Sequence, residues 1–150
     1  MAKKKEGKQK DEHKNIKVFF SKEKPPIYEK AHEIFGVKWK KKVIFTYGNT
    51  IHCKNVIGKQ KINHEVVHVY QQMEYGKDKW WDRYFEDVNF RLGQEVEAYL
   101  NEIKWVKANV FDMKLRSIIL NKIASDLSSP MYGSMVSFKN AKEILNIEDD

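Results

Sequence analysis

Cysteine is nearly absent from this chain, because Cys53 is the only one among 150 residues. An internal disulfide is therefore excluded, and this composition fits a reducing compartment. No apolar run reaches the ~18–20 residues that span a bilayer. The first 14 residues hold lysines but no apolar segment of the kind found in secretory signals. We therefore expect a cytoplasmic protein with no membrane partner.

Acidic residues are outnumbered in the N-terminal half of the chain. Residues 1–75 contain 17 lysines and 8 acidic residues, whereas residues 76–150 contain 11 basic and 13 acidic ones. We expect residues 1–15 to be a disordered basic arm and residues 16–150 to form a single, monomeric domain. The arm has no aromatic residues that would stack on bases. It would contact nucleic acid or an acidic partner only weakly, through counterion release.

Glycine and proline are few, with 7 and 3 residues, and their positions divide the chain into elements. Gly48-Asn49 separates two β-prone runs and predicts a tight hairpin over 43–54 with an exposed edge. Apolar periodicity predicts helices over 27–35, 61–75, 79–85, 90–107, 112–127 and 137–145. A short β-prone run at 16–20 precedes them. This order indicates an α+β fold.

The predicted helix at 61–75 carries a chemical motif, His64-Glu65-x-x-His68, within "KINHEVVHVYQQ". Residues four apart lie on one helical face, so the two imidazoles can bind one zinc ion. Glu65 lies about 100° round the helix and can act as a general base on water activated by the metal. The alternative is a surface helix that happens to carry two histidines. A separate apolar stripe is expected to face the core: Ile62, Val66, Val69 and Met73.

Zinc needs a third protein ligand, and no histidine follows His68 in the sequence. The stretch "RLGQEVEAYLNE" offers three glutamates instead. Glu95 lies about 60° from the centre of the apolar face of this helix, and Glu97 lies about 140° away. Glu102 is close to Glu95 in angle but two turns further along. We predict that Glu95 is the third ligand; the alternative is that all three glutamates are solvated.

The motifs also resemble a known family. The stretches "HEVVHVYQQ", "WWDRYFEDVNFRLGQEVEAY" and "LSSPMYG" resemble small phage- and prophage-encoded metallopeptidases of the gluzincin class. This resemblance implies a minimal zincin-like domain, a helical glutamate ligand at Glu95 and a location in the cytoplasm of a bacterial host. In that class an aspartate often follows the ligand by four residues and orients a histidine. Tyr99 stands there, so we expect one histidine to lack its carboxylate partner and the enzyme to be slow.

These observations predict a zinc metallopeptidase that hydrolyses peptide or protein substrates with Glu65 as general base. Tyr132, in the loop "SSPMYG", is a candidate for stabilising the oxyanion; its alternative is a tyrosine packed on the core. Two further hypotheses remain open. One is a catalytically weak or inactive zinc fold with a structural or binding role, and the other is a basic nucleic-acid-binding domain without metal.

The adjacent pair His52-Cys53 is the other potential set of ligands in the sequence. Neighbouring strand residues point to opposite faces, so at most one of the two can face the zinc. We expect a buried cysteine and a surface histidine. Nothing beyond the presence of both residue types supports a nucleophilic cysteine site.

Overall fold

The computed structural model describes residues 16–149, so the expected basic arm at 1–15 lies outside the described residues. Over the described range the chain is α+β, with six α-helices and a small three-stranded sheet. None of these helices combines the length and the apolar character needed to cross a membrane. In chain order the elements are β1 (Phe19–Ser21), α2 (Tyr28–Phe35), β2 (Ile44–Tyr47), β3 (Thr50–Cys53), α3 (Lys59–Tyr75), α4 (Lys77–Glu86), α5 (Val88–Asn109), α6 (Met113–Leu127), the 3₁₀ turn η1 (Pro130–Tyr132) and α7 (Phe138–Ile144).

The hairpin predicted around Gly48-Asn49 is confirmed. Strands β2 and β3 pair antiparallel, with Tyr47 opposite Thr50. Gly48 has a φ of 62°, a left-handed conformation that favours glycine. The sequence did not reveal that β1 joins the sheet parallel to β3. Because the strand order is β1-β3-β2, β3 is central and β2 is the only strand of the hairpin with an open edge.

Capping residues lie at several helix ends. Gly36 ends α2 in a left-handed conformation, with a φ of 70°. The Asp87 side chain accepts a hydrogen bond from the amide of Phe90 at the start of α5. Ser137 accepts one from the amide of Asn140 at the start of α7. These local signals explain why the sequence places the helices within a few residues of their observed bounds.

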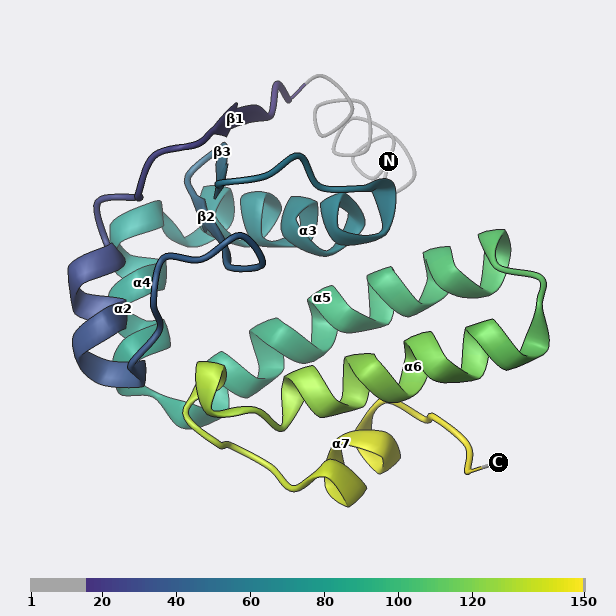
Figure 1. Ribbon diagram of the computed structural model, residues 1–150. Helices are drawn as coiled ribbons and strands as arrows, with labels where there is room; N and C mark the ends of the chain where they lie inside the picture. The colour runs from purple at the N-terminus through teal and green to yellow at the C-terminus, as the bar shows by residue number, and fades with distance from the viewer. Residues whose placement is uncertain (1–15, 150) are drawn as a thin grey trace, which may run out of the picture.

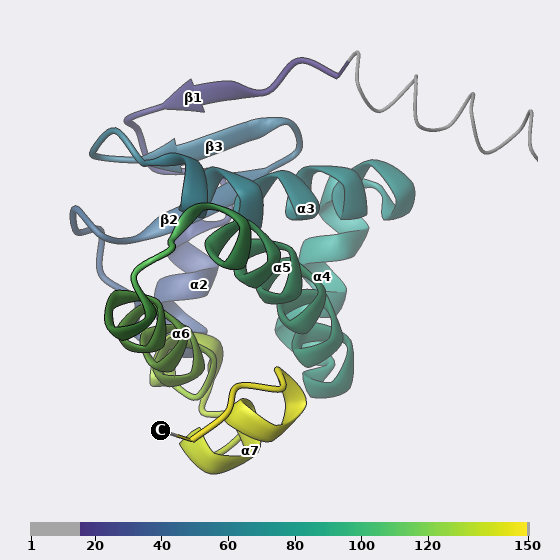
Figure 2. The same cartoon turned by 90° about the vertical axis from the view of Figure 1, so that its right-hand side faces the viewer.

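Helices α3 and α5 pack against each other, and the other elements lie around this pair. The sheet lies along α3, α2 and α4 pack together at one end, and α5 and α6 form an antiparallel pair (Figure 1). Viewed from the side, β1 and α7 lie at opposite faces of the molecule, with α3 and α5 between them (Figure 2). The two helices that carry the motif residues therefore lie between the sheet and α7.

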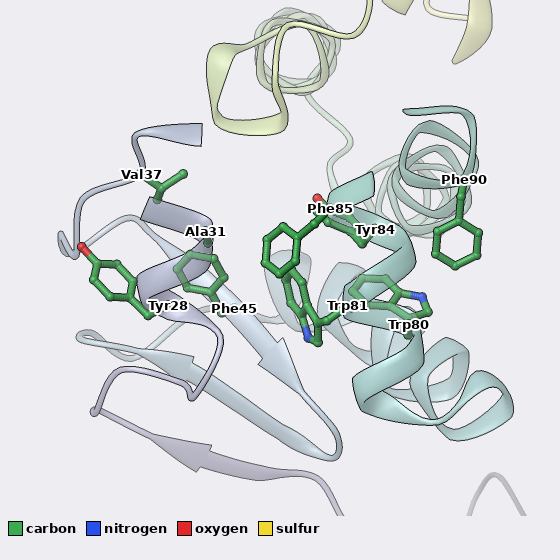
Figure 3. Packing of buried hydrophobic residues seen from close by; sticks show 9 residues of the cluster. All are labelled: Tyr28, Ala31, Val37, Phe45, Trp80, Trp81, Tyr84, Phe85 and Phe90. Carbon is green, nitrogen blue, oxygen red and sulfur yellow. The ribbon is translucent and has the colours of Figure 1, made fainter. Parts of the chain in front are cut away.

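Two apolar clusters flank this pair of helices. An aromatic cluster fills the space between α2, β2 and α4, where the rings of Phe45, Trp81 and Phe85 converge (Figure 3). A mainly aliphatic cluster joins α5, α6 and α7. Tyr132 packs against both clusters, so the η1 turn lies where they meet.

The apolar stripe expected on α3 does not form the buried face, and this prediction was wrong. Of its members only Val69 is fully buried, whereas Met73 is 52% exposed. The inward face consists mainly of polar residues: His64, Glu65, His68, Gln71 and Gln72. Burying so many polar groups is costly unless each has a partner, so their contacts identify what the helix is built to hold.

Candidate metal centre

The structure brings the three predicted ligand residues together between α3 and α5. His64 and His68 come from α3, and Glu95 comes from the facing turn of α5. All three are buried, with exposed fractions of 4%, 4% and 3%. Their potential ligand atoms lie within 4.8 Å of one another. Glu97, on the same helix as Glu95, is exposed, as its helical angle predicted.

Three donor atoms converge on one point. The Nε2 atoms of His64 and His68 are 3.1 Å apart. Oε1 of Glu95 lies 3.1 Å from the first of these nitrogens and 3.3 Å from the second. A tetrahedral ion with bonds of about 2.0–2.1 Å holds its ligand atoms about 3.3 Å apart. The spacing of the three donors is therefore close to that of three ligands around one zinc ion.

The opposite nitrogen of each ring has an oxygen close to it. Nδ1 of His64 lies 3.1 Å from Oε1 of Glu102, a contact at ion-pair distance, and neither of these two buried atoms forms an aligned hydrogen bond among the described residues. Nδ1 of His68 lies 2.8 Å from Oε1 of Gln71. The amide of Gln71 is oriented by its Nε2, which donates to the carbonyl of Gln94 at 3.1 Å. The bond to Gln71 requires that Nδ1 of His68 carries a proton, and the charge of the nearby Glu102 carboxylate favours a proton on Nδ1 of His64.

This tautomer has a consequence for the three converging donors. A neutral imidazole that is protonated on Nδ1 presents a lone pair on Nε2. Two such lone pairs and the Glu95 carboxylate then face one another at 3.1–3.3 Å inside the protein. Three facing acceptors repel unless a cation lies among them. The chemistry of the donor set therefore fits a bound metal ion, and two imidazoles with one carboxylate are a ligand set typical of zinc.

Without a metal, protons supply the positive charge. Burial lowers the pKa of His64, but the carboxylates of Glu65, Glu102 and Glu95 outweigh it and raise that pKa to about 10. Burial raises the pKa of Glu95, yet the two histidines reverse this and hold it well below its usual range. The pocket is thus electrostatically built for positive charge, which either protons or a metal ion can provide.

Glu65 lies beside this donor set without belonging to it. Its Oε2 is 3.7 Å from Nε2 of His64, and its Oε1 accepts a hydrogen bond from the Thr46 hydroxyl at 3.1 Å. Burial raises the pKa of Glu65, although the histidines act against this. A carboxylate that is fixed by one oxygen and has a raised pKa is suited to taking up a proton.

Glu95 and Tyr132 are each held by a tyrosine. The Tyr84 hydroxyl donates to Oε2 of Glu95 at 2.7 Å, which leaves Oε1 to face the histidines. The hydroxyls of Tyr99 and Tyr132 are 2.7 Å apart. The buried Arg91 donates from Nε to the carbonyl of Tyr132 at 2.9 Å and so fixes the η1 turn to α5.

Two hollows meet at the metal centre. One is a small cavity of about 50 Å³ walled by the aromatic cluster, including Phe35, Phe45 and Trp81. The other is a groove of about 650 Å³ between α6 and the segment that leads from β3 into α3. The following residues line both hollows: Val43, Ile44, His64, Glu65, Met131 and Tyr132. The predicted catalytic residues therefore lie at the junction of the two spaces.

Glu102 is the residue of the site that sequence analysis missed. We expected Tyr99, in the place of an aspartate, to leave one histidine without a carboxylate partner, and Nδ1 of His68 does have an amide oxygen, that of Gln71, in place of a carboxylate. His64, in contrast, has the carboxylate of Glu102 beside its Nδ1. Glu102 lies seven residues after Glu95, is fully buried, and contacts His64 on the side away from the three converging donors. A signal for this position exists in the sequence, because Glu102 shares its helical angle with Glu95, although it lies two turns further along the helix.

His52 and Cys53 take no part in this site. Cys53 is buried and its Sγ donates to the carbonyl of Lys41, as expected for a structural cysteine. His52 is also buried, contrary to expectation, because β1 covers this part of β3 and Nδ1 of His52 lies 2.9 Å from the carbonyl of Glu23.

Comparisons with protein-family models, with curated proteins and with solved structures find no match to this chain.

Proposed function

We propose that this protein is a zinc-dependent metallopeptidase with a minimal zincin-like arrangement. The observation that carries the proposal is the set of three facing acceptors from His64, His68 and Glu95, each oriented from behind by another buried side chain. These three residues would hold the ion. Zinc, when bound, lowers the pKa of a water molecule and polarises a carbonyl oxygen.

Glu65 is the general base in this proposal. The hydrogen bond from Thr46 keeps one of its oxygens in place, and the other oxygen lies at the edge of the donor set. Glu65 would take a proton from the attacking water and pass it to the nitrogen of the leaving amine. Its raised pKa favours the first step, because a carboxylate with a higher pKa takes up a proton more readily.

Tyr132 has the second catalytic role. It lines both hollows beside Glu65, and its hydroxyl is within hydrogen-bond distance of Tyr99. If Tyr99 donates the proton of that contact, Tyr132 accepts it and directs its own proton toward the oxyanion that forms in the transition state. Arg91 keeps the turn that carries Tyr132 in place.

The edge of β2 would align the substrate. Alternation along an antiparallel strand directs the backbone groups of Ile44 and Thr46 to the open edge. The Thr46 carbonyl is already taken, because it accepts from Nε2 of Gln72 at 2.7 Å and from Nε1 of Trp81 at 3.0 Å. An added peptide strand would therefore pair at Ile44, which lines both hollows.

The test is a peptide-library digest with the wild-type protein, the Glu65→Gln variant and a chelated control. Glu65→Gln should keep zinc and fold while losing activity by about 10²–10⁴, the usual contribution of a positioned acid–base group. Glu74→Gln, an exposed position on the same helix, is the matched control and should retain activity. Cleavage that persists in Glu65→Gln or under chelation would contradict the proposal. No cleavage by any form, with one zinc per chain, would favour the structural alternative.

A further inference from the structure

The larger hollow is lined by lysines and aliphatic side chains that have no part in the proposed catalysis. It runs from the metal centre along the start of α3, with α6 forming the opposite wall. We propose that this groove selects an acidic, aliphatic segment of the substrate chain on one side of the scissile bond. The inference deepens the proposed peptidase function and rests on it for the position of that bond.

The charges along the groove are mostly positive. Four lysines line it, against two acidic residues, Asp126 and the buried Glu65. Lys122 is 2.8 Å from Asp126, and Lys61 is 3.2 Å from Glu102, so these two are largely neutralised. Lys41 and Lys42 are exposed and form no ion pair among the described residues. They directly precede the β2 edge, so a bound strand would pass beside two unpaired cations.

The walls between these charges are aliphatic. Val56, in the segment before α3, and Ile118, on α6, both line the groove and are 93% and 64% exposed. Ile57, Ile119 and Ile123 line it as well. Exposed aliphatic surface flanked by lysines matches a chain in which acidic and aliphatic residues occur together, because each kind of side chain then has a complementary contact.

Other occupants fit less well. Residues 1–15 of this chain contain six lysines and three acidic residues, so their charge has the same sign as that of the groove. Single-stranded nucleic acid would be attracted by the lysines, but it binds on platforms of aromatic side chains, and the walls here are mainly valine and isoleucine. An acidic peptide segment is the occupant that both the charge and the apolar surface favour.

The smaller hollow complements the groove across the catalytic residues. It is narrow, at about 50 Å³, and walled by aromatic and aliphatic side chains. On that side the substrate would present a single apolar side chain. On one side of the catalytic residues the charged groove would hold several substrate residues. On the other side the small apolar hollow would hold one substrate side chain.

The experiment measures binding separately from cleavage. Fluorescence anisotropy would measure the affinity of zinc-loaded Glu65→Gln protein for three peptides. The peptides share the same aliphatic residues and differ only at the remaining positions, which are glutamate, glutamine or lysine. The glutamate peptide should bind about tenfold more tightly than the glutamine peptide at low salt, since two exposed pairs contribute modestly each. This difference should shrink as added salt screens the charges.

Charge reversal gives the decisive comparison. Lys41→Glu/Lys42→Glu should remove the preference for glutamate and favour the lysine peptide. The control Lys79→Glu/Lys104→Glu makes the same change in net charge at exposed positions outside the groove, and should keep the wild-type preference. Equal binding of all three peptides would overturn the inference. So would an equal loss in the control pair, or tighter binding of single-stranded oligothymidylate than of the glutamate peptide.

The outcomes also separate this inference from the proposed function. Selective binding of the glutamate peptide, without hydrolysis by zinc-loaded wild-type protein, would uphold the groove as an acidic-peptide site and refute the peptidase. Hydrolysis with no preference among the three peptides would uphold the peptidase and overturn the assignment of the groove.

Discussion

Removing the Glu102 carboxylate should weaken zinc binding although this residue is not one of the three proposed ligands. Glu102 is fully buried and holds Nδ1 of His64 at 3.1 Å. Its other oxygen accepts from Gln60 at 2.7 Å and from Lys61 at 3.2 Å. Burial raises the pKa of Glu102, but His64 and Lys61 outweigh this and lower it, so the residue is a carboxylate at neutral pH.

The size of the effect follows from these contacts. Loss of a partner that orients a ligand histidine costs about 10–100-fold in metal affinity, which is about 1.4–2.7 kcal/mol. The loss of zinc affinity in Glu102→Ala should be near the upper end of this range, because the ring of His64 loses the carboxylate beside its Nδ1 and is free to change tautomer. Glu102→Gln should lie near the lower end, because an amide oxygen can still accept from Nδ1, whereas the negative charge that Lys61 contacts is gone.

The assay is a competition titration of zinc against a chelating dye, with Glu97→Ala as control. Glu97 is an exposed glutamate on the same helix, so its removal should leave the zinc affinity unchanged. Circular dichroism of the metal-free proteins would establish that each variant is folded. A folded Glu102→Ala protein that binds zinc as tightly as Glu97→Ala would refute the role assigned to Glu102.

Three further predictions concern the same site. Glu95→Ala should reduce zinc affinity by more than about 100-fold, beyond the value of an orienting partner, while Glu97→Ala should not; the reverse result in a zinc titration would mean that the register of α5 is misread. Despite burial, carboxylates raise the pKa of His64 to about 10 in the metal-free protein. The contribution of protonated His64 to the free energy of unfolding is therefore complete below about pH 6.5 and is lost as pH rises through 10. Zinc binding at pH 7 should therefore release at least one proton, and calorimetry in buffers of different ionisation enthalpy that finds none would contradict this. Tyr132→Phe should lower kcat by about 10²-fold or more if its hydroxyl stabilises the oxyanion, with zinc content unchanged; an unaltered kcat would leave Tyr132 as a packing residue.

Local chemistry made much of the fold predictable. Gly48-Asn49, Gly36, Asp87 and Ser137 act on their immediate neighbours, so the hairpin and the helix ends could be read from the sequence. The pairing of β1 with β3 could not, because it joins segments about 30 residues apart through backbone hydrogen bonds that any sequence can form. The burial of His52 follows from that pairing and was missed with it.

The helical angle of a residue predicted which glutamate is the candidate ligand, but the position of a residue along the helix axis could not be used in the same way, and Glu102 was missed for this reason. Helical phase distinguished the buried Glu95 from the exposed Glu97. The same phase placed Glu102 on the inward side, but the point at which α3 crosses α5 is set by tertiary packing and is not encoded in either helix alone. The polar inward face of α3 was missed for a related reason. Apolar residues were expected to be buried, whereas here the polar residues have each other as partners.

The most direct test of the central claim is X-ray absorption at the zinc edge on protein purified without a histidine tag. We expect one zinc per chain, with two imidazole nitrogens at about 2.0–2.1 Å and only oxygen in the remaining positions. The double variant His64→Ala/His68→Ala should contain no stoichiometric zinc. A wild-type protein without zinc would contradict the account. So would a sulfur ligand at about 2.3 Å, because it would move the metal to Cys53 and away from α3 and α5.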